Sequence, residues 1–191
     1  MTLDDIFCWI TDTLGKTPQS ADSPFKTMTL STVDKSGHPQ ARVVVMREFS
    51  DADKRITFYT DYRAQKIRDI QSNPKIALTF YDPAEQVQLR CCANTQINYQ
   101  NPAAKTSWDK TSRYNKLSYA TSENPGAQLE QPFANTNGMV DASLTYQNFA
   151  AVYCQLTSLE YLKLNNDGHL RARFVPNPIN PCGWSGHWLV P

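Results

Sequence analysis

The chain has 191 residues and a formal net charge of +1. This length suffices for one domain that buries its own core, and the near-neutral charge excludes a broad basic surface for nucleic acid. No apolar run reaches the ~18 residues that a membrane-spanning helix requires. The start of the sequence is acidic and lacks the pattern of a signal peptide. The five cysteines have no paired spacing, so we expect reduced thiols in a cytoplasmic protein.

The first residues predict a helix. Thr2 and Asp5 have the spacing of a capping box. Apolar side chains then recur at helical intervals as far as Gly15, which can end the helix. A polar stretch with prolines follows, so residues 1–22 are expected to form an N-terminal helix and linker.

The rest of the chain predicts many strands and few helices. Strands are predicted at 27–33, 40–49, 56–60, 75–80, 87–97, 150–156, 160–164, 169–174 and 184–190. Helices are predicted at about 63–72, after Asn101-Pro102, around 113–119 and near Leu144, with a long loop at 121–140. This order indicates a mainly β (α+β) fold, an antiparallel barrel with helices around it.

The segment 41–47 (ARVVVMR) places two guanidinium groups at the ends of an apolar, β-branched strand. Arg42 and Arg47 are roughly 16 Å apart at about 3.3 Å per residue, close to the length of an extended mononucleotide. A buried strand rarely carries arginine without an anionic partner. Either these arginines bind an anionic ligand, or they are rim residues paired with Asp or Glu.

The start of the helix at 63–72 is a candidate phosphate site. Arg63 and Lys66 share a helix face, close to the free N–H groups and positive dipole end of the first turn. Arg42 can add a bidentate contact to a phosphate. The alternative for Arg63 and Lys66 is an ordinary solvated helix face.

Two later strands carry polar side chains on one face. Gln88 alternates with apolar neighbours and has a carboxamide that both donates and accepts, as a flavin pyrimidine edge requires. His169, Arg171 and Arg173 also share one strand face. The alternatives are a solvent-facing glutamine and a wet edge strand whose positive charge blocks aggregation.

The sequence lacks the motifs of several enzyme classes. There is no Gly-x-Ser-x-Gly, no P-loop and no Gly-x-Gly-x-x-Gly after a strand. The three histidines do not form a metal-ligand pattern. A bound organic cofactor is therefore the expected source of any reactivity.

Several of these segments together resemble the pyridoxamine 5′-phosphate oxidases and related FMN-binding split-barrel proteins, in the shorter branch of that family. The matching segments, in the family's order, are 30–39 (LSTVDKSGHP), 42–47 (RVVVMR), 58–61 (FYTD), Lys66, Asn73-Pro74, Gln88, 171–174 (RARF), Trp184 and 189–191 (LVP). The resemblance implies one FMN-binding domain over 1–191, built as a six-stranded split barrel. It also implies a homodimer with FMN in each cleft between subunits, and no nucleic-acid or membrane partner.

The resemblance also implies roles for individual residues. The implied cofactor-binding residues are Arg42, Val43, Val44, Val45, Arg47, Tyr59, Thr60, Arg63, Gln65, Lys66, Gln88 and Arg173. Arg42 and Lys66 would hold the phosphate, with Arg47 and Gln88 near the flavin ring. The implied substrate-binding residues are Arg47, Arg113, His169 and Arg171, and His169 and Arg171 are also the implied catalytic residues.

The chain departs from the oxidase pattern at several positions. Ala64-Gln65-Lys66 replaces the usual Ser-Arg-Lys, Arg47 replaces a lysine, and Leu162 lies where a ring-stacking tryptophan is expected. Asp109 takes the place of a substrate-binding tyrosine.

The family's activity is hydride transfer from a substrate, such as a B6 vitamer phosphate, to flavin with O2 as the acceptor. We therefore expect an FMN-dependent oxidoreductase acting on the CH–NH2 group of donors. The alternatives are a flavin reductase that uses NAD(P)H and a non-catalytic protein that binds flavin or haem.

Overall fold

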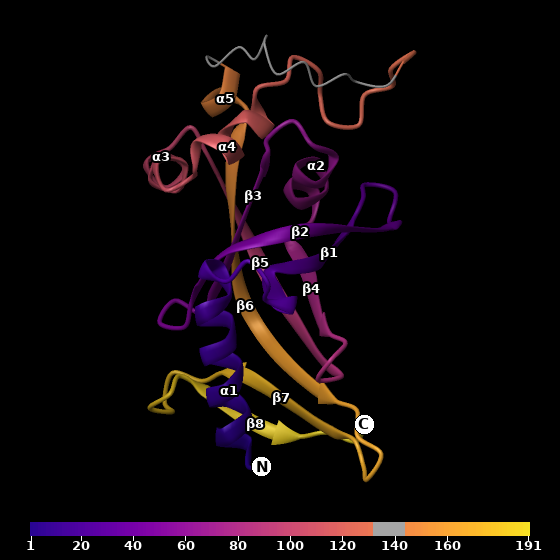
Figure 1. Ribbon diagram of the computed structural model, residues 1–191, viewed down its shortest axis with the longest axis vertical. Helices are drawn as coiled ribbons and strands as arrows, with labels where there is room; N and C mark the ends of the chain where they lie inside the picture. The colour runs from indigo at the N-terminus through magenta and orange to yellow at the C-terminus, as the bar shows by residue number, and fades with distance from the viewer. Residues whose placement is uncertain (132–143) are drawn as a thin grey trace.

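The computed structural model describes residues 1–131 and 144–191 (Figure 1). The strands are β1 (Thr27–Val33), β2 (Pro39–Ser50), β3 (Arg55–Asp61), β4 (Lys75–Asp82), β5 (Val87–Tyr99), β6 (Phe149–Lys163), β7 (Leu170–Pro176) and β8 (Trp184–Trp188). The helices are α1 (Leu3–Lys16), α2 (Gln65–Ser72), α3 (Pro102–Asp109), α4 (Arg113–Lys116) and α5 (Leu144–Gln147). Three 3-10 turns are η1 (Thr17–Gln19), η2 (Pro24–Lys26) and η3 (Leu117–Tyr119).

Antiparallel strands form a closed barrel. The sheet runs β3-β2-β1-β4-β5-β6, and a further pairing of β3 with β6 closes it. β7 and β8 continue the sheet beyond β6 as a hairpin outside this closure. The expected six-stranded antiparallel barrel with peripheral helices is confirmed.

Alternating side chains explain why these segments form a barrel. In β1, Met28, Leu30 and Thr32 are buried while the residues between them are more exposed, as a strand with one core face requires. The core also includes Met46, Phe58 and further apolar side chains of the barrel strands. Burial of such side chains is the main favourable term in folding.

Helix α1 packs its apolar face against the barrel and the β7–β8 hairpin (Figure 1). Ile6, Ile10 and Leu14 are fully buried, and Phe7 contacts the rings of Phe174 and Trp184. The predicted capping box is present, but the helix ends at Lys16 rather than at Gly15. Gly15 does not adopt the left-handed conformation of a glycine that ends a helix, so the helix continues past it.

A second, smaller aromatic cluster lies between α3 and β6. Trp108, Tyr119 and Phe149 form it, with ring centroids 5.2–6.0 Å apart. Tyr59 packs against Phe149 at 5.1 Å. The cluster therefore fixes the position of Tyr59 on β3.

One expectation is wrong. The strands predicted at 150–156 and 160–164 are a single strand, β6. Leu156 pairs with Ala93 and Ser158 pairs with Cys92, so the pairing register shifts around Thr157. An extra residue of this kind interrupts the alternation of apolar side chains without ending the strand.

The remaining boundaries agree with the sequence to within a few residues. Asn101 caps α3 by accepting a hydrogen bond from the Ala104 N–H. Residues 132–140 of the loop predicted at 121–140 lie outside the described residues. All five cysteines are free thiols. Within the described ranges, every helix is too short or too polar to cross a membrane.

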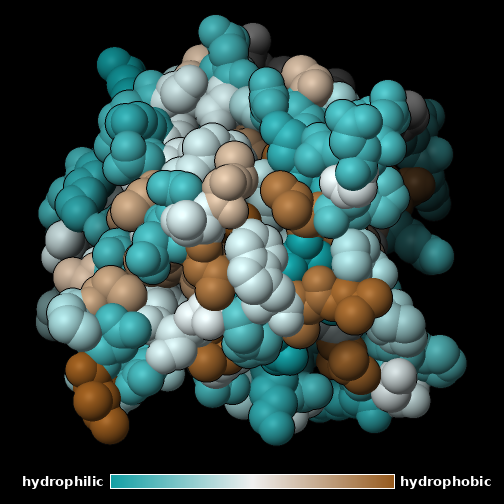
Figure 2. Space-filling view, turned by 90° about the horizontal axis from the view of Figure 1, so that it is seen from below, coloured by the Kyte–Doolittle hydropathy of each residue, from teal (hydrophilic) through white to brown (hydrophobic). Residues whose placement is uncertain are grey.

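The end of the molecule that carries β7 and β8 is largely hydrophilic, with apolar side chains scattered among polar ones (Figure 2). Ile179, Trp188 and Val190 are exposed large apolar residues in this part of the chain. Single exposed apolar side chains are normal for a protein surface.

Candidate functional site

The first candidate group lies where β1 and β2 meet α2. Arg42 donates to the Thr32 hydroxyl at 2.6 Å and forms an ion pair with Asp69 at 3.3 Å. Asp69 is 1% exposed and also accepts hydrogen bonds from Thr32 and Gln65, each at 2.9 Å. A buried carboxylate requires such partners. Arg42, the predicted phosphate ligand, is thus also part of a buried network.

Lys66 is a neighbour of Arg42 but is held differently. Its ammonium group donates to the Thr60 hydroxyl at 3.1 Å. No carboxylate among the described residues lies within ion-pairing distance of it. Burial, and next the positive charge of Arg42, lower the pKa of Lys66, while the carboxylates of Asp61 and Asp69 act in the opposite direction. Two adjacent cations that repel each other at a half-buried site are stabilised by a bound anion.

The start of α2 adds backbone donors to this group. Ala64 is the N-cap residue and offers no side-chain hydrogen bond to the first turn. The first N–H groups of a helix point along its axis and favour an anion. Lys66 is the second residue of α2, so its ammonium group and these N–H groups lie at the same helix end.

Arg63 and Gln65 are engaged within the protein. Arg63 forms an ion pair with Asp61 at 2.7 Å and donates to the carbonyls of Thr121 and Ser122. The hydrogen bonds that Arg63 donates to the Asp61 carboxylate raise the pKa of Arg63. Gln65 binds Asp69. These two side chains order the surroundings of Lys66 rather than extending freely towards a ligand.

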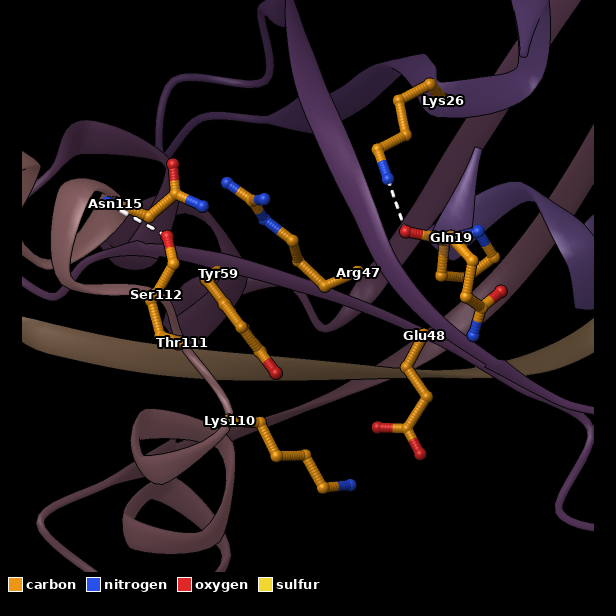
Figure 3. A pocket seen from close by; sticks show the side chains of 10 residues that line it. Gln19, Lys26, Arg47, Glu48, Tyr59, Lys110, Thr111, Ser112 and Asn115 are labelled. Carbon is orange, nitrogen blue, oxygen red and sulfur yellow. Dashed lines mark hydrogen bonds between the residues drawn. The ribbon is translucent and has the colours of Figure 1, made fainter. Parts of the chain in front are cut away.

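The second candidate group surrounds a cavity of about 400 Å³ (Figure 3). Such a volume is typical of small-molecule sites. Its lining residues are Pro18, Gln19, Lys26, Arg47, Glu48, Tyr59, Lys110, Thr111, Ser112 and Asn115. η1, η2, β2, β3 and the α3–α4 region all contribute to it.

Two of the predicted cofactor-binding residues, Arg47 and Tyr59, line this cavity. The Arg47 guanidinium lies 5.9 Å from the centre of the Tyr59 ring, a cation–π distance. Burial raises the pKa of Tyr59, while a hydrogen bond with Ser107 acts in the opposite direction. Tyr59 is therefore a neutral hydrogen-bonding group at physiological pH.

Three further charged residues at the cavity have no signal in the sequence. Lys26, Glu48 and Lys110 line it together with Arg47. Lys26 donates to the Pro18 carbonyl at 2.5 Å. These residues belong to no motif, and only the three-dimensional pairing of η2, β2 and the end of α3 identifies them.

The third candidate group lies on β5, β6 and β7. Gln88 pairs across the sheet with Leu162, which pairs in turn with Arg171. Arg171 binds Glu160 at 2.8 Å. The exposed Arg173 pairs across strands with Glu160. Gln88, Arg171 and Arg173 thus share one sheet face, and none of them belongs to the lining of the Arg47 cavity.

Two predicted substrate residues lie on the surface. Arg113 is exposed at the start of α4 and is not part of the cavity lining, although its neighbour Ser112 is. His169 is exposed just before β7 and its Nδ1 accepts a hydrogen bond from the Asn165 N–H. The structure does not bring either residue to the Arg47 cavity within one chain.

The predicted backbone positions follow Arg42 along β2. Val44 faces the core, Val45 is half-buried and Val43 is exposed by 67%. Thr60 is buried beside Lys66. The structure therefore gathers Arg42, Thr60 and Lys66 at one place.

Residues 9–98 match the family model described as pyridoxamine 5′-phosphate oxidase, FMN-binding domain. Over these residues the chain is similar to the pyridoxamine 5′-phosphate oxidase-related family. The resemblance inferred from the sequence motifs is confirmed, and so is FMN as the cofactor that the family binds.

Curated relatives cover most of the chain. A pyridoxine/pyridoxamine 5′-phosphate oxidase of Burkholderia mallei is 28% identical over 166 residues, 86% of this chain. A pyridoxine/pyridoxamine 5′-phosphate oxidase 2 of Hydrogenovibrio crunogenus is 31% identical over 165 residues. The chain spans 62% of the length of each of these relatives.

Solved structures share the fold. A pyridoxamine 5′-phosphate oxidase-related, FMN binding protein from Nostoc punctiforme has a TM-score of 0.77 and 21% identity, with 100% of both chains covered. PhzG from Burkholderia lata, in complex with tetrahydrophenazine-1-carboxylic acid, has a TM-score of 0.69 and 14% identity, covering 99% of this chain and 92% of PhzG. At these identities the likeness concerns the fold.

Proposed function

We propose that the chain is an FMN-dependent oxidase that acts on the CH–NH2 group of a small donor and uses O2 as electron acceptor. The observation that carries the proposal is the anion site at the start of α2. There Lys66 has no ion-pair partner within the described ranges, and α2 has no side-chain cap. The curated relatives are named for pyridoxine and pyridoxamine 5′-phosphate, and these two compounds are the first substrates to test.

The residues around Lys66 fit the phosphate of FMN. Lys66 supplies an ammonium group, and the first turn of α2 supplies N–H groups. Arg42 lies close enough to lower the pKa of Lys66, and its guanidinium has donors beyond those that bind Thr32 and Asp69. Arg47 and Tyr59 would then lie beside the flavin ring, next to the cavity.

FMN, when bound, would supply the redox chemistry, as an acceptor of a hydride from the donor and a donor of electrons to O2. The protein contributes binding and charge. Arg47 offers a fixed positive charge in the cavity. His169 and Arg171 are proposed to orient the substrate, and Glu160 holds the Arg171 guanidinium in place.

We propose a homodimer with FMN between the subunits. Gln88 and Arg173 are predicted to contact the same cofactor as Arg47, but in one chain they lie outside the lining of the Arg47 cavity. A second copy can supply them. The exposed Val43, whose neighbours across the sheet are Thr29 and then Thr79, belongs to an outer barrel face suited to such a contact.

A spectrum and an oxidase assay test the enzymatic proposal. The purified protein is expected to bind FMN and to show the absorbance bands of oxidised flavin. During aerobic incubation with pyridoxamine or pyridoxine 5′-phosphate, hydrogen peroxide should accumulate in step with loss of substrate. A protein that stays colourless with excess FMN would refute the cofactor site. A flavin-loaded protein that forms no peroxide would refute the oxidase activity.

Mixed dimers test the shared site. Lys66→Met and Arg173→Ala remove residues that are proposed to meet the same FMN from different subunits. Each variant alone should bind FMN weakly. When the two are unfolded and refolded together, about half of the dimers should be heterodimers, each with one intact site, so tight FMN binding should partly return. If no tight binding returns, Lys66 and Arg173 do not contribute to one site from two chains.

A non-catalytic flavin-binding protein is the second candidate. The exposed position of Arg113 and its absence from the cavity lining favour it, since a phosphate-bearing substrate would lose one predicted contact. In that case the protein would bind FMN without forming peroxide from either B6 vitamer phosphate and without oxidising NAD(P)H. Oxidation of NAD(P)H by the flavin-loaded protein would instead indicate a flavin reductase.

A further inference from the structure

The cations of this protein fall into two kinds according to their partners. Arg42, Arg63 and Arg171 each form an ion pair with a carboxylate that is at most 13% exposed. Lys26 and Arg47, in contrast, line the same cavity, and no carboxylate in residues 1–131 and 144–191 lies within ion-pairing distance of either. Unpaired cations that share a concave site are typical of a site for an anion.

The surroundings of Lys26 strengthen the contrast. Among the described residues, its ammonium group donates to the carbonyls of Thr17 and Pro18, at 3.5 and 2.5 Å. Carbonyl oxygens orient an ammonium group but do not neutralise it. Burial and then the neighbouring Arg47 lower the pKa of Lys26, so the two positive charges are close enough to repel each other.

The lining also contains Glu48 and Lys110. In Figure 3 these two side chains are drawn on the side of Arg47 opposite to Lys26, and no ion pair joins them in the described part of the chain. One carboxylate against three cations leaves the lining with an excess positive charge. Lys26 and Arg47 contribute to this excess on one side of the cavity.

We propose that Lys26 and Arg47 together bind the anionic group of the substrate, a carboxylate or a phosphate ester, and that Lys26 thereby determines specificity for acidic substrates. The identification of this ligand as the substrate rests on the proposed function. The anion site itself does not, because the cavity and its charges exist in the chain without FMN. In this proposal Lys26 has the substrate-binding role that the resemblance implies for Arg113.

The hydrogen-bond donors of both side chains suit such a ligand. The Arg47 guanidinium offers a planar pair of donors that matches either a carboxylate or a phosphate. The Lys26 ammonium group has three donors, so its two carbonyl contacts leave capacity for a ligand. Ser112 and Asn115 add polar groups to the same lining.

Calorimetric titration with three small probes tests the proposal. The full chain is titrated with benzoate, phenyl phosphate and benzyl alcohol, once with saturating FMN and once without FMN. At least one of the two anions should bind, and neutral benzyl alcohol should bind at least about 10-fold more weakly, since hydrogen bonds to charged groups are the stronger ones. A preference between benzoate and phenyl phosphate identifies the group that the site accepts.

Charge-matched variants assign the effect to Lys26. Lys26→Gln should weaken the preferred anion by about 10-fold or more, while Lys26→Arg, which keeps the charge, should retain most of the affinity. Lys105→Gln is the control, because Lys105 loses the same charge but pairs with Asp109 and does not line the cavity. Equal melting temperatures of the variants establish that they are folded.

Three results would overturn the proposal: equal binding of benzyl alcohol and the anions, unchanged anion binding in Lys26→Gln, or an equal loss in Lys105→Gln. Failure of the proposed function is distinguishable from these. A chain that binds anions through Lys26 but never binds FMN retains the anion site and refutes the flavoenzyme. A chain that binds FMN but discriminates no anion refutes the anion site alone.

Discussion

The two ends of the segment 41–47 hold their arginines in different ways. Arg42 contacts Thr32 and the buried Asp69, so its charge is balanced within the fold. Arg47, five residues later, faces a cavity and contacts the Tyr59 ring, without an ion pair in the described ranges. Two arginines of one strand that look equivalent in the sequence therefore differ in what they stabilise.

This difference separates structural from ligand-binding roles. Removing a cation from a buried pair leaves an uncompensated charge, which is strongly destabilising. Removing a cation that repels its neighbours costs little stability and lowers the affinity for an anion. Each cation near the candidate site can thus be assigned by comparing its effects on unfolding and on binding.

The largest expected effect is that of Arg42→Ala on stability. Loss of Arg42 leaves Asp69, which is 1% exposed, without its ion-pair partner. We expect the free energy of unfolding to fall by about 3 kcal/mol, the lower part of the range for breaking a buried pair. Urea unfolding without FMN measures it.

The double variant Arg42→Ala/Asp69→Asn is the control for this prediction. It removes the negative charge of Asp69 as well as the positive charge of Arg42, so most of the lost stability should return. The prediction is wrong if Arg42→Ala is as stable as the natural chain, or if the double variant is no more stable than Arg42→Ala. Either result would show that the ion pair of Arg42 and Asp69 does not stabilise the fold.

Lys66→Met should act on FMN rather than on folding. The variant loses a charged contact to the phosphate, and the affinity for FMN should fall roughly 10- to 100-fold, from about 1.5–3 kcal/mol for a hydrogen bond to a charged group. The unfolding free energy without FMN should not fall, because Lys66 is half-buried beside Arg42 and lacks a carboxylate partner in the described ranges.

Riboflavin separates the phosphate contact from the rest of the site. It lacks the phosphate, so its affinity should be the same for the natural chain and for Lys66→Met. Equal losses for FMN and riboflavin would mean that Lys66 supports the shape of the site instead of binding the phosphate. Fluorescence titration with either flavin provides the measurement.

The sequence predicts the barrel well because strand patterns are local. Residues close together in the sequence determine the alternating burial in β1 and β4. The same holds for the capping box of Thr2 and Asp5. The continuity of β6 could not be predicted in this way, because the extra residue near Thr157 is accommodated by a register shift against Cys92 and Ala93 on another strand.

The site is only partly predictable for the same reason. The motifs place Lys66 at the start of a helix, where the structure has it. The partner of Arg42 was not predictable, since Asp69 is 27 residues away and looks like any charged helix residue. Lys26 likewise reaches the Arg47 cavity from a short turn that has no sequence signature.

The smallest predicted effect is the pH dependence that Lys66 gives to stability. Burial and Arg42 lower the pKa of Lys66 from its ordinary value of 10.5. Below the lowered pKa, Lys66 is protonated in both the folded and unfolded states, and the folded state carries the full penalty. As pH rises through that pKa towards 10.5, the folded state loses the proton first, so the unfolded state binds more protons and stability rises.

Urea unfolding from pH 7 to 10.5 in the absence of FMN, compared between the natural chain and Lys66→Met, isolates this contribution. The natural chain should gain stability relative to the variant as pH rises, because other titrating groups are common to both and cancel. Saturating FMN should diminish the difference in slope, since a bound phosphate favours the charged ammonium group and raises the pKa of Lys66. If the stability–pH curves of the natural chain and Lys66→Met are parallel with and without FMN, Lys66 is solvated and its pKa is not affected by Arg42. The contrast between paired and unpaired cations would then not apply to the start of α2.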